Sequence, residues 1–143
     1  MKYISATVYS FTIWVVASII SGLMCGIYLI IIEHEMSRES VIMISIFFSF
    51  AVALPGIALF WICFMICIAN KNTGRKLFAQ LLNAAFISGL LSALIFYLLF
   101  RNEFKSHAYL MAAFGIASAI AAVFVHRSTF LSVFKNYSHE ETV

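Results

Sequence analysis

Charged residues are scarce in this 143-residue chain, and their positions leave long uncharged intervals. Lys, Arg, Asp and Glu together make up 10% of the sequence, whereas hydrophobic residues make up 64%. Soluble domains are usually about 45–50% apolar, so the composition excludes an ordinary water-soluble fold. Residues 3–32, 40–70, 77–100 and 106–126 contain no charged side chain. Each interval is long enough to cross the hydrocarbon core of a bilayer, which takes about 20 helical residues.

These intervals also lack the alternation of polar and apolar residues that marks the strands of a membrane barrel, and they are about twice too long for such strands. Because backbone N–H and C=O groups find no water in hydrocarbon, each segment must satisfy them internally as a helix. We therefore predict an all-α, polytopic integral membrane protein, a bundle of four transmembrane helices that forms a single domain over residues 1–143. The expected spans are residues 8–32, 41–69, 77–100 and 107–125.

Recognisable chemistry is scarce as well. No Asp, Glu, Lys or Arg lies at depth in a predicted span, although most ion-coupled transporters keep such a residue there. The cysteines Cys25, Cys63 and Cys67 lie inside predicted spans and form no Cys-x-x-Cys motif, which argues against a redox or zinc site. We predict no catalytic residues. The net charge of +3 is scattered over short loops, so we expect no nucleic-acid partner.

Two of the histidines are candidate ligands for haem or zinc. His34 and His107 lie near the ends of predicted spans, where a bis-histidine haem would need them at matched depth on facing helices. Glu33, His34 and Glu35 offer donor atoms for zinc. Solvated interfacial histidines are the favoured interpretation, so we predict no cofactor and no metal site.

The distribution of Lys and Arg predicts the orientation, because basic residues favour the cytoplasmic side. Six basic residues gather on one side of the predicted bundle, namely Lys2, Lys71, Arg75, Lys76, Arg127 and Lys135. Three lie on the other side, namely Arg38, Arg101 and Lys105. We expect both termini in the cytoplasm and the chain in a bacterial inner (plasma) membrane.

Small residues recur every fourth position in the first and third spans. They are Ser18, Gly22 and Gly26, then Ala85, Gly89 and Ala93, with Gly115 on the small face of the fourth span. Such stripes let membrane helices approach closely, either within the bundle or against a second copy or a partner subunit. Residues 17–26 and 84–93 share five identities in ten, for which chance similarity and hairpin duplication both remain open.

Two further features lie within the spans. Pro55, the only proline, is followed by Gly56 near the middle of the second span. Proline removes a helical hydrogen bond, so we expect a kink there, serving either as a hinge or simply to fit the helix to its neighbours. Gln80 and Asn83 are the deepest strongly polar pair, suited to hydrogen bonds between helices or to the mouth of a narrow pore.

Residues 126–143 form a predicted cytoplasmic tail that begins as an amphipathic interfacial helix. Phe130, Phe134 and Tyr137 lie on its apolar side, which we expect to rest on the membrane surface.

The expected function is that of a non-catalytic membrane subunit. It would anchor, scaffold or sense for a larger homo- or hetero-oligomeric complex, with a cytosolic partner in the manner of phage-defence or bacteriocin-immunity membrane proteins. That comparison rests on general build and not on a motif. One alternative is a homo-oligomeric pore lined by small polar residues. A second alternative is a small lipid- or quinone-handling membrane enzyme.

Overall fold

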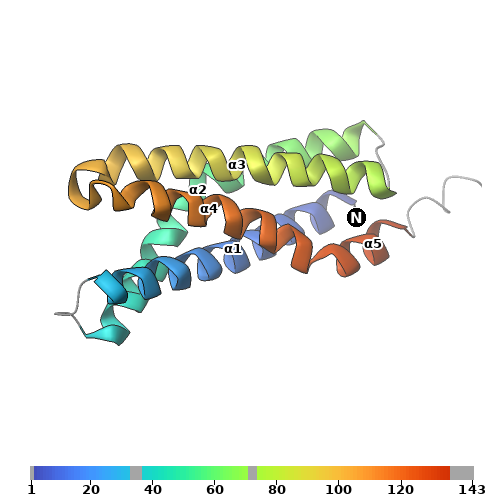
Figure 1. The fold of residues 1–143 in the computed structure, drawn as a ribbon. Helices are drawn as coiled ribbons and strands as arrows, with labels where there is room; N and C mark the ends of the chain where they lie inside the picture. The colour runs from blue at the N-terminus through green and yellow to red at the C-terminus, as the bar shows by residue number, and fades with distance from the viewer. Residues whose placement is uncertain (1, 33–36, 71–73, 136–143) are drawn as a thin grey trace, which may run out of the picture.

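The computed structural model describes residues 2–32, 37–70 and 74–135 of the chain. In this part of the chain all regular structure is helical and no strand is present. The helices are α1 (Lys2–Ile32), α2 (Arg38–Ala69), α3 (Gly74–Phe104), α4 (His107–Val125) and α5 (Arg127–Lys135) (Figure 1). The first four are long and apolar enough to cross a membrane. The all-helical class and the four candidate spans are therefore confirmed.

The helices extend further than three of the predicted spans. α4 has the predicted bounds, but α1 begins at Lys2, α2 at Arg38, and α3 runs from Gly74 to Phe104. At α2 and α3 the added residues include Lys, Arg and Glu, which are good helix formers and continue a helix beyond its apolar part. α3 ends where Lys105 adopts a positive φ of 49°, which turns the chain into α4.

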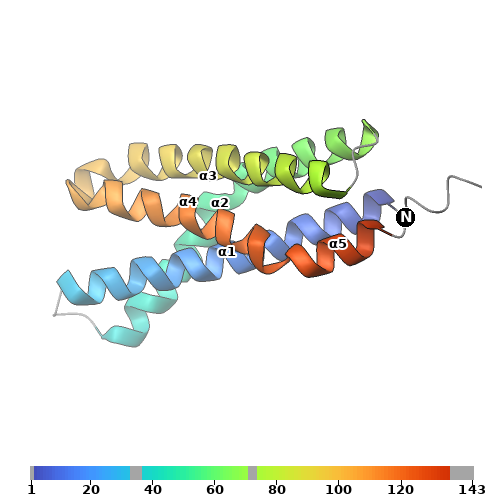
Figure 2. The same cartoon turned by 45° about the vertical axis from the view of Figure 1, so that its right-hand side comes forward.

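The four long helices form two antiparallel hairpins, α1–α2 and α3–α4 (Figures 1 and 2). The start of α1, the end of α2, the start of α3 and helix α5 lie together at one end of the bundle, which we call the N-terminal end. The end of α1, the start of α2 and the turn from α3 to α4 lie at the opposite, distal end. There the two hairpins separate from one another, as both views show.

Helix α2 links the two hairpins and passes without interruption through Pro55. Pro55 is exposed on the outer surface of the bundle, whereas its neighbour Gly56 is buried. A Cβ atom added to Gly56 would lie 2.7 Å from the carbonyl oxygen of Ser88 in α3. The absence of a side chain at Gly56 therefore lets α2 and α3 approach closely. The kink expected at Pro55 stays a prediction.

Aromatic side chains fill the N-terminal end of the bundle. This aromatic cluster consists of Tyr9, Phe60, Phe64, Phe78 and Phe130. Ring centroids lie 5.5 Å apart for Tyr9 and Phe130, and 6.1 Å apart for both Tyr9–Phe64 and Phe60–Phe64. The Tyr9 hydroxyl donates a hydrogen bond to the carbonyl oxygen of His126, between α4 and α5. The cluster therefore ties α1, α2, α3 and α5 together.

Helix α5 joins the bundle differently from the expected surface helix. Phe130, expected on a face resting on the membrane, is only 1% exposed and packs in the aromatic cluster. The Phe130 ring is buried by other rings of the same chain and not by lipid, so this part of the apolar side of α5 faces the protein. The Phe134 side chain and Tyr137 lie outside the described part of the chain.

Candidate functional site: a cavity between the two hairpins

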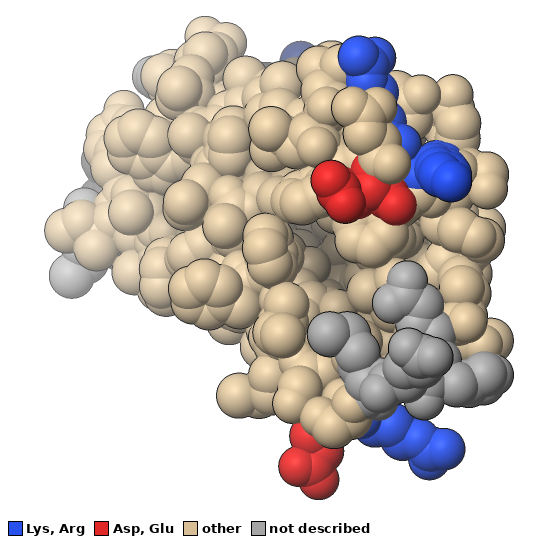
Figure 3. All heavy atoms as spheres, turned by 90° about the vertical axis from the view of Figure 1, so that its left-hand side faces the viewer, with Lys and Arg blue, Asp and Glu red and all other residues tan. Residues whose placement is uncertain are grey.

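Where the two hairpins separate, they enclose a cavity of about 400 Å³. All four long helices contribute to its wall. The space-filling view from the distal end shows a hollow there, with acidic atoms beside it and basic atoms further out (Figure 3). The inner limit is formed by Ile13 of α1 and Phe60 of α2, and Phe60 also belongs to the aromatic cluster. The cavity therefore opens toward the distal end and is backed by rings at the other.

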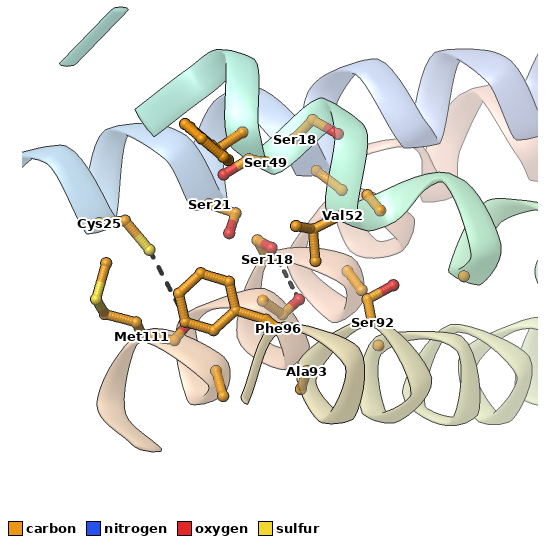
Figure 4. A pocket seen from close by; sticks show the side chains of 18 of the residues that line it. Ser18, Ser21, Cys25, Ser49, Val52, Ser92, Ala93, Phe96, Met111 and Ser118 are labelled. Atoms are coloured by element: carbon orange, nitrogen blue, oxygen red, sulfur yellow. Dashed lines mark hydrogen bonds between the residues drawn. The ribbon is translucent and has the colours of Figure 1, made fainter. Parts of the chain in front are cut away.

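Serine hydroxyls supply most of the polar groups in the cavity wall. Each of the four long helices contributes at least one, and the seven serines are Ser18, Ser21, Ser45, Ser49, Ser88, Ser92 and Ser118. In the close-up view, the Ser49 hydroxyl of α2 and the Ser21 hydroxyl of α1 both point toward the cavity (Figure 4). Ser92 and Ser118 lie on α3 and α4. The wall thus carries neutral hydrogen-bonding groups from both hairpins.

Two of these serine hydroxyls are paired with backbone carbonyls, whereas one serine and one tryptophan of the described lining have a buried polar atom without a partner. The hydroxyls of Ser88 and Ser118 donate to the carbonyl oxygens of Ala85 and Gly115, at 3.0 and 2.9 Å. In the described part of the chain, the Ser18 hydroxyl and the Trp14 indole N–H are buried without a hydrogen-bond partner. Leaving such a group unsatisfied costs about 1–3 kcal/mol. Both residues line the cavity and lie one helical turn apart on α1.

Aromatic rings form the outer part of the wall. Phe96, Phe100 and Phe104 follow one another at intervals of one turn on α3, with centroids 5.0 Å apart for the first pair and 6.0 Å for the second. Phe48 of α2 meets Phe100 edge-on at 5.7 Å, which bridges α2 and α3. The distal half of the cavity is therefore apolar and ring-rich.

On the side of the cavity opposite to α2 and α3, polar contacts connect α1 to α4. The Tyr28 hydroxyl lies 2.7 Å from Nδ1 of His107, and the Cys25 thiol donates to the carbonyl oxygen of Met111 at 3.9 Å. Cys25 lines the cavity, whereas Cys63 and Cys67 are not among the lining residues. These contacts hold α1 against α4 while the interior between the hairpins stays open.

The glycines of the small-residue stripes hold each hairpin together. A Cβ atom on Gly22 would lie 2.9 Å from the backbone nitrogen of Ile46, and one on Gly26 would lie 3.1 Å from the Cα of Ile42. On α3, a Cβ on Gly89 would lie 3.2 Å from the Cα of Ile116. These glycines therefore pack α1 on α2 and α3 on α4, within one chain. Association with a second copy or a partner remains a prediction.

The other small residues of the stripes face the cavity. Ser18, Ala85, Ala93 and Gly115 all line it. Nothing lies within 4 Å of a Cβ atom placed on Gly115. Residues 17–26 and 84–93, which resemble each other in sequence, thus occupy corresponding places on α1 and α3 in the wall of one cavity.

The polar pair of α3 lies elsewhere. Gln80 is half-buried and Asn83 is exposed, both toward the N-terminal end of α3, and neither is among the described residues that line the cavity. The role expected for this pair, in hydrogen bonding or at a pore mouth, stays a prediction.

The sequence does not predict this cavity within a single chain, because its small residues fit close helix packing or the lining of an oligomeric pore equally well. The available signal was that serines occur at similar depth in all four spans, spaced three or four residues apart in the first three. Serine is small enough for close packing but also adds a hydrogen-bonding group, so this pattern is compatible with a polar interior.

The lining suits binding more than acid–base chemistry. Of the described residues in the lining, Glu103 at the rim is the only charged one, and the others are apolar or neutral. Among the described residues, no group of three His, Cys, Asp or Glu side chains is placed to hold a metal ion; His34 lies outside them. Comparisons of the chain with protein-family models, curated proteins and solved structures find no match.

Proposed function

We propose that the chain is a non-catalytic, multi-pass membrane subunit that anchors, scaffolds or senses for a larger complex, and that ligand sensing is its principal task. Support for the membrane location comes from the outer surface of the bundle. Val8, Phe11, Phe47, Ile87 and Leu99 are each more than half exposed. A soluble monomer rarely exposes so much contiguous apolar surface, whereas lipid tails would cover it without cost.

The proposed orientation places the N-terminal end of the bundle in the bacterial cytoplasm. The start of α1, the start of α3 and helix α5 lie at this end. They carry five of the nine basic residues, namely Lys2, Arg75, Lys76, Arg127 and Lys135, and basic residues favour the cytoplasmic side. The cavity then opens toward the opposite, outer side of the membrane. A molecule arriving from outside or from the outer leaflet would reach it first.

One observation carries the sensing function, namely the cavity that all four helices line. Its volume of about 400 Å³ falls within the range of about 300–1,000 Å³ usual for small-molecule sites. Because the neutral wall offers contacts but no acid or base at depth, a bound molecule would be held and not transformed. A ligand that bridges the two hairpins would also favour one arrangement of them.

A partner would receive this change at the cytoplasmic end. Arg127 and Ser128 of α5 are exposed, while Phe130 of the same helix is fixed in the aromatic cluster. Any shift of α2 or α3 would therefore reach α5 through the rings of Phe64 and Phe78.

The test is the composition of the particle purified from its native membrane in mild detergent, measured by native mass spectrometry. We expect the 16.0 kDa chain together with a second protein chain. A particle made of this chain alone would contradict the subunit assignment.

Truncation after residue 135 is the matched variant for this test. It removes the polar tail but keeps Phe130 and so preserves the core. We expect the truncated chain to remain inserted and to lose or weaken its partner. Undiminished co-purification would show that the tail is not the docking element.

A homo-oligomeric pore is the second candidate, favoured by the serine hydroxyls and by the fact that the cavity reaches Gly56, beside Pro55. A pore is commonly lined by small polar groups or gated by a hydrophobic constriction. In planar bilayers a pore would conduct, and Pro55→Ala would change its gating. A silent bilayer over a range of voltages would remove this candidate.

A further inference from the structure

We propose that the cavity binds a neutral aromatic molecule that carries one or two hydroxyl or carbonyl oxygens, with its oxygen near Trp14 and Ser18. This inference rests on the proposed function, because it names the class of molecule that the cavity would sense. Three properties of the wall determine the class: its charge, its unpaired polar groups and its rings.

The charge of the wall favours a neutral molecule. Among the described residues that line the cavity, Glu103 is the only charged one, and it lies at the rim. No cation among the described lining residues stands deeper in the cavity to pair with an anion. Burying an unpaired charge is far more costly than burying an apolar or hydrogen-bonded group. A carboxylate or sulfonate would in addition meet the like charge of Glu103 on entry.

The unpaired polar groups favour a ligand that has an oxygen able to accept hydrogen bonds. In the described chain the Trp14 indole N–H and the Ser18 hydroxyl lack partners, and Ser18 is only 1% exposed. An indole N–H can only donate, while a hydroxyl can donate and accept. The two residues are four positions apart on α1, so their side chains lie on the same face of the helix. Both polar atoms are buried as the side chains stand, so a ligand would reach them once the two side chains rotate toward the cavity. A hydroxyl or carbonyl oxygen placed between the rotated groups would then accept from both.

The nearby serines extend this polar position. Ser21 and Ser49 face the space beside Ser18 from α1 and α2 (Figure 4). Both are half-buried, so their hydroxyls are available without unfolding the wall. A second oxygen on the ligand would find a partner here.

The rings favour an aromatic body. Trp14, Phe48, Phe60, Phe96 and Phe100 line the cavity together with Phe104. Aromatic pairs in offset or edge-to-face contact contribute about 0.5–1.5 kcal/mol beyond area burial. Along α1 the lining extends from Ile13 to Leu29, about 24 Å at the helical rise, which accommodates a fused ring system. Water alone would satisfy the hydroxyls but would make no apolar contact with the faces of these rings that line the cavity.

Gly115 gives a way to close the cavity with little disturbance elsewhere. The lining residues of α4 are Met111, Ala112, Gly115, Ser118 and Ala119. At 3.6 residues per turn Gly115 lies in the middle of this arc, so a side chain there points inward. Nothing lies within 4 Å of the position of its Cβ. Gly115→Leu should therefore fill the cavity, whereas Ala117→Leu adds similar bulk to the exposed face of α4.

The experiment compares naphthalene, 2-naphthol and 2-naphthoate, which share one ring system and differ in their oxygen group. The full chain is reconstituted in nanodiscs of zwitterionic lipid, and saturable binding is measured against empty nanodiscs at pH 7. We expect 2-naphthol to bind most tightly, naphthalene about 3- to 10-fold more weakly for want of about one hydrogen bond, and 2-naphthoate not measurably. Ala117→Leu should keep 2-naphthol binding, and Gly115→Leu should abolish it.

A serine variant tests the position of the oxygen. Ser18→Ala should weaken 2-naphthol binding by about 3- to 10-fold, the equivalent of one neutral hydrogen bond, and leave naphthalene binding unchanged. Equal binding of 2-naphthol and naphthalene would overturn the ligand class. Unchanged 2-naphthol binding in Gly115→Leu, or no saturable binding of any probe, would overturn the site itself. Because the test uses this chain without a partner, its failure is distinct from failure to find a partner subunit.

Discussion

At the scale of single residues, Gly22 and Gly115 have opposite surroundings. Gly22 faces the backbone of Ile46, whereas nothing lies within 4 Å of a Cβ on Gly115. We expect Gly115→Ala to stabilise the bundle by about 0.8–1 kcal/mol, because alanine is the better helix former. Gly22→Ala should destabilise it by about 1–3 kcal/mol, because the added methyl group forces α1 away from α2. Unfolding titrations in mixed micelles measure both, and equal effects would contradict the packing described.

A second prediction for a single residue concerns the Tyr9 hydroxyl. Tyr9 donates to the carbonyl oxygen of His126 and so connects α1 to the junction of α4 and α5. We expect Tyr9→Phe to lower the free energy of unfolding by about 1 kcal/mol, the usual net value of one hydrogen bond. Tyr3 is exposed, so Tyr3→Phe is the matched control and should change little. The same unfolding titration decides whether the hydroxyl contributes as expected.

At the scale of elements, α5 depends on one side chain. Phe130 contacts the rings of Tyr9, Phe64 and Phe78, which belong to three different helices. We expect Phe130→Ala to destabilise the bundle by about 3–5 kcal/mol, the usual range for removal of a buried ring. Phe86 is 46% exposed, so Phe86→Ala should have a small effect. If the two variants lose equal stability, α5 is not held by this cluster.

The long helices could be predicted from the sequence because their cause is local. Four charge-free intervals give four helices, and α4 begins and ends at the predicted residues, His107 and Val125. The ends of α3 could not be predicted in this way. Its helix continues past Arg101 and Glu103, because a charge limits the apolar interval but not the backbone hydrogen bonds that define a helix.

The cavity could not be predicted because it depends on which faces meet. Because Ser18, Gly22 and Gly26 are spaced four residues apart, the sequence predicts one packing surface on the first span. In the structure, Gly22 and Gly26 contact α2 while Ser18 lines the cavity. Similarly, Phe130 fits a membrane-surface helix by its spacing, and only the position of α5 beside α1 turns it into a core residue. Such choices between neighbours are set by long-range packing, not by local pattern.

At the scale of the whole molecule, the two ends of the bundle differ. The N-terminal end is filled by the aromatic cluster, and the distal end opens into the cavity. From this asymmetry and the proposed orientation we expect water and ligands to enter from the outer side and to stop near the middle of the membrane.

Cysteine labelling tests that claim most directly, in a background where Cys25, Cys63 and Cys67 are replaced by serine or alanine. Ser49→Cys places a thiol in the cavity wall, and Ala51→Cys places one on the exposed face of the same helix at similar depth. Asn70→Cys marks the end of the bundle that we assign to the cytoplasm. A membrane-impermeant thiol reagent is added to intact cells, and labelling is then repeated after permeabilisation.

We expect Ser49→Cys to react in intact cells, because the cavity joins it to the outer water. Ala51→Cys should stay unreactive in lipid, and Asn70→Cys should react only after permeabilisation. Labelling of Ser49→Cys only from the cytoplasmic side, or no faster than Ala51→Cys, would contradict an outward-opening cavity between the two hairpins.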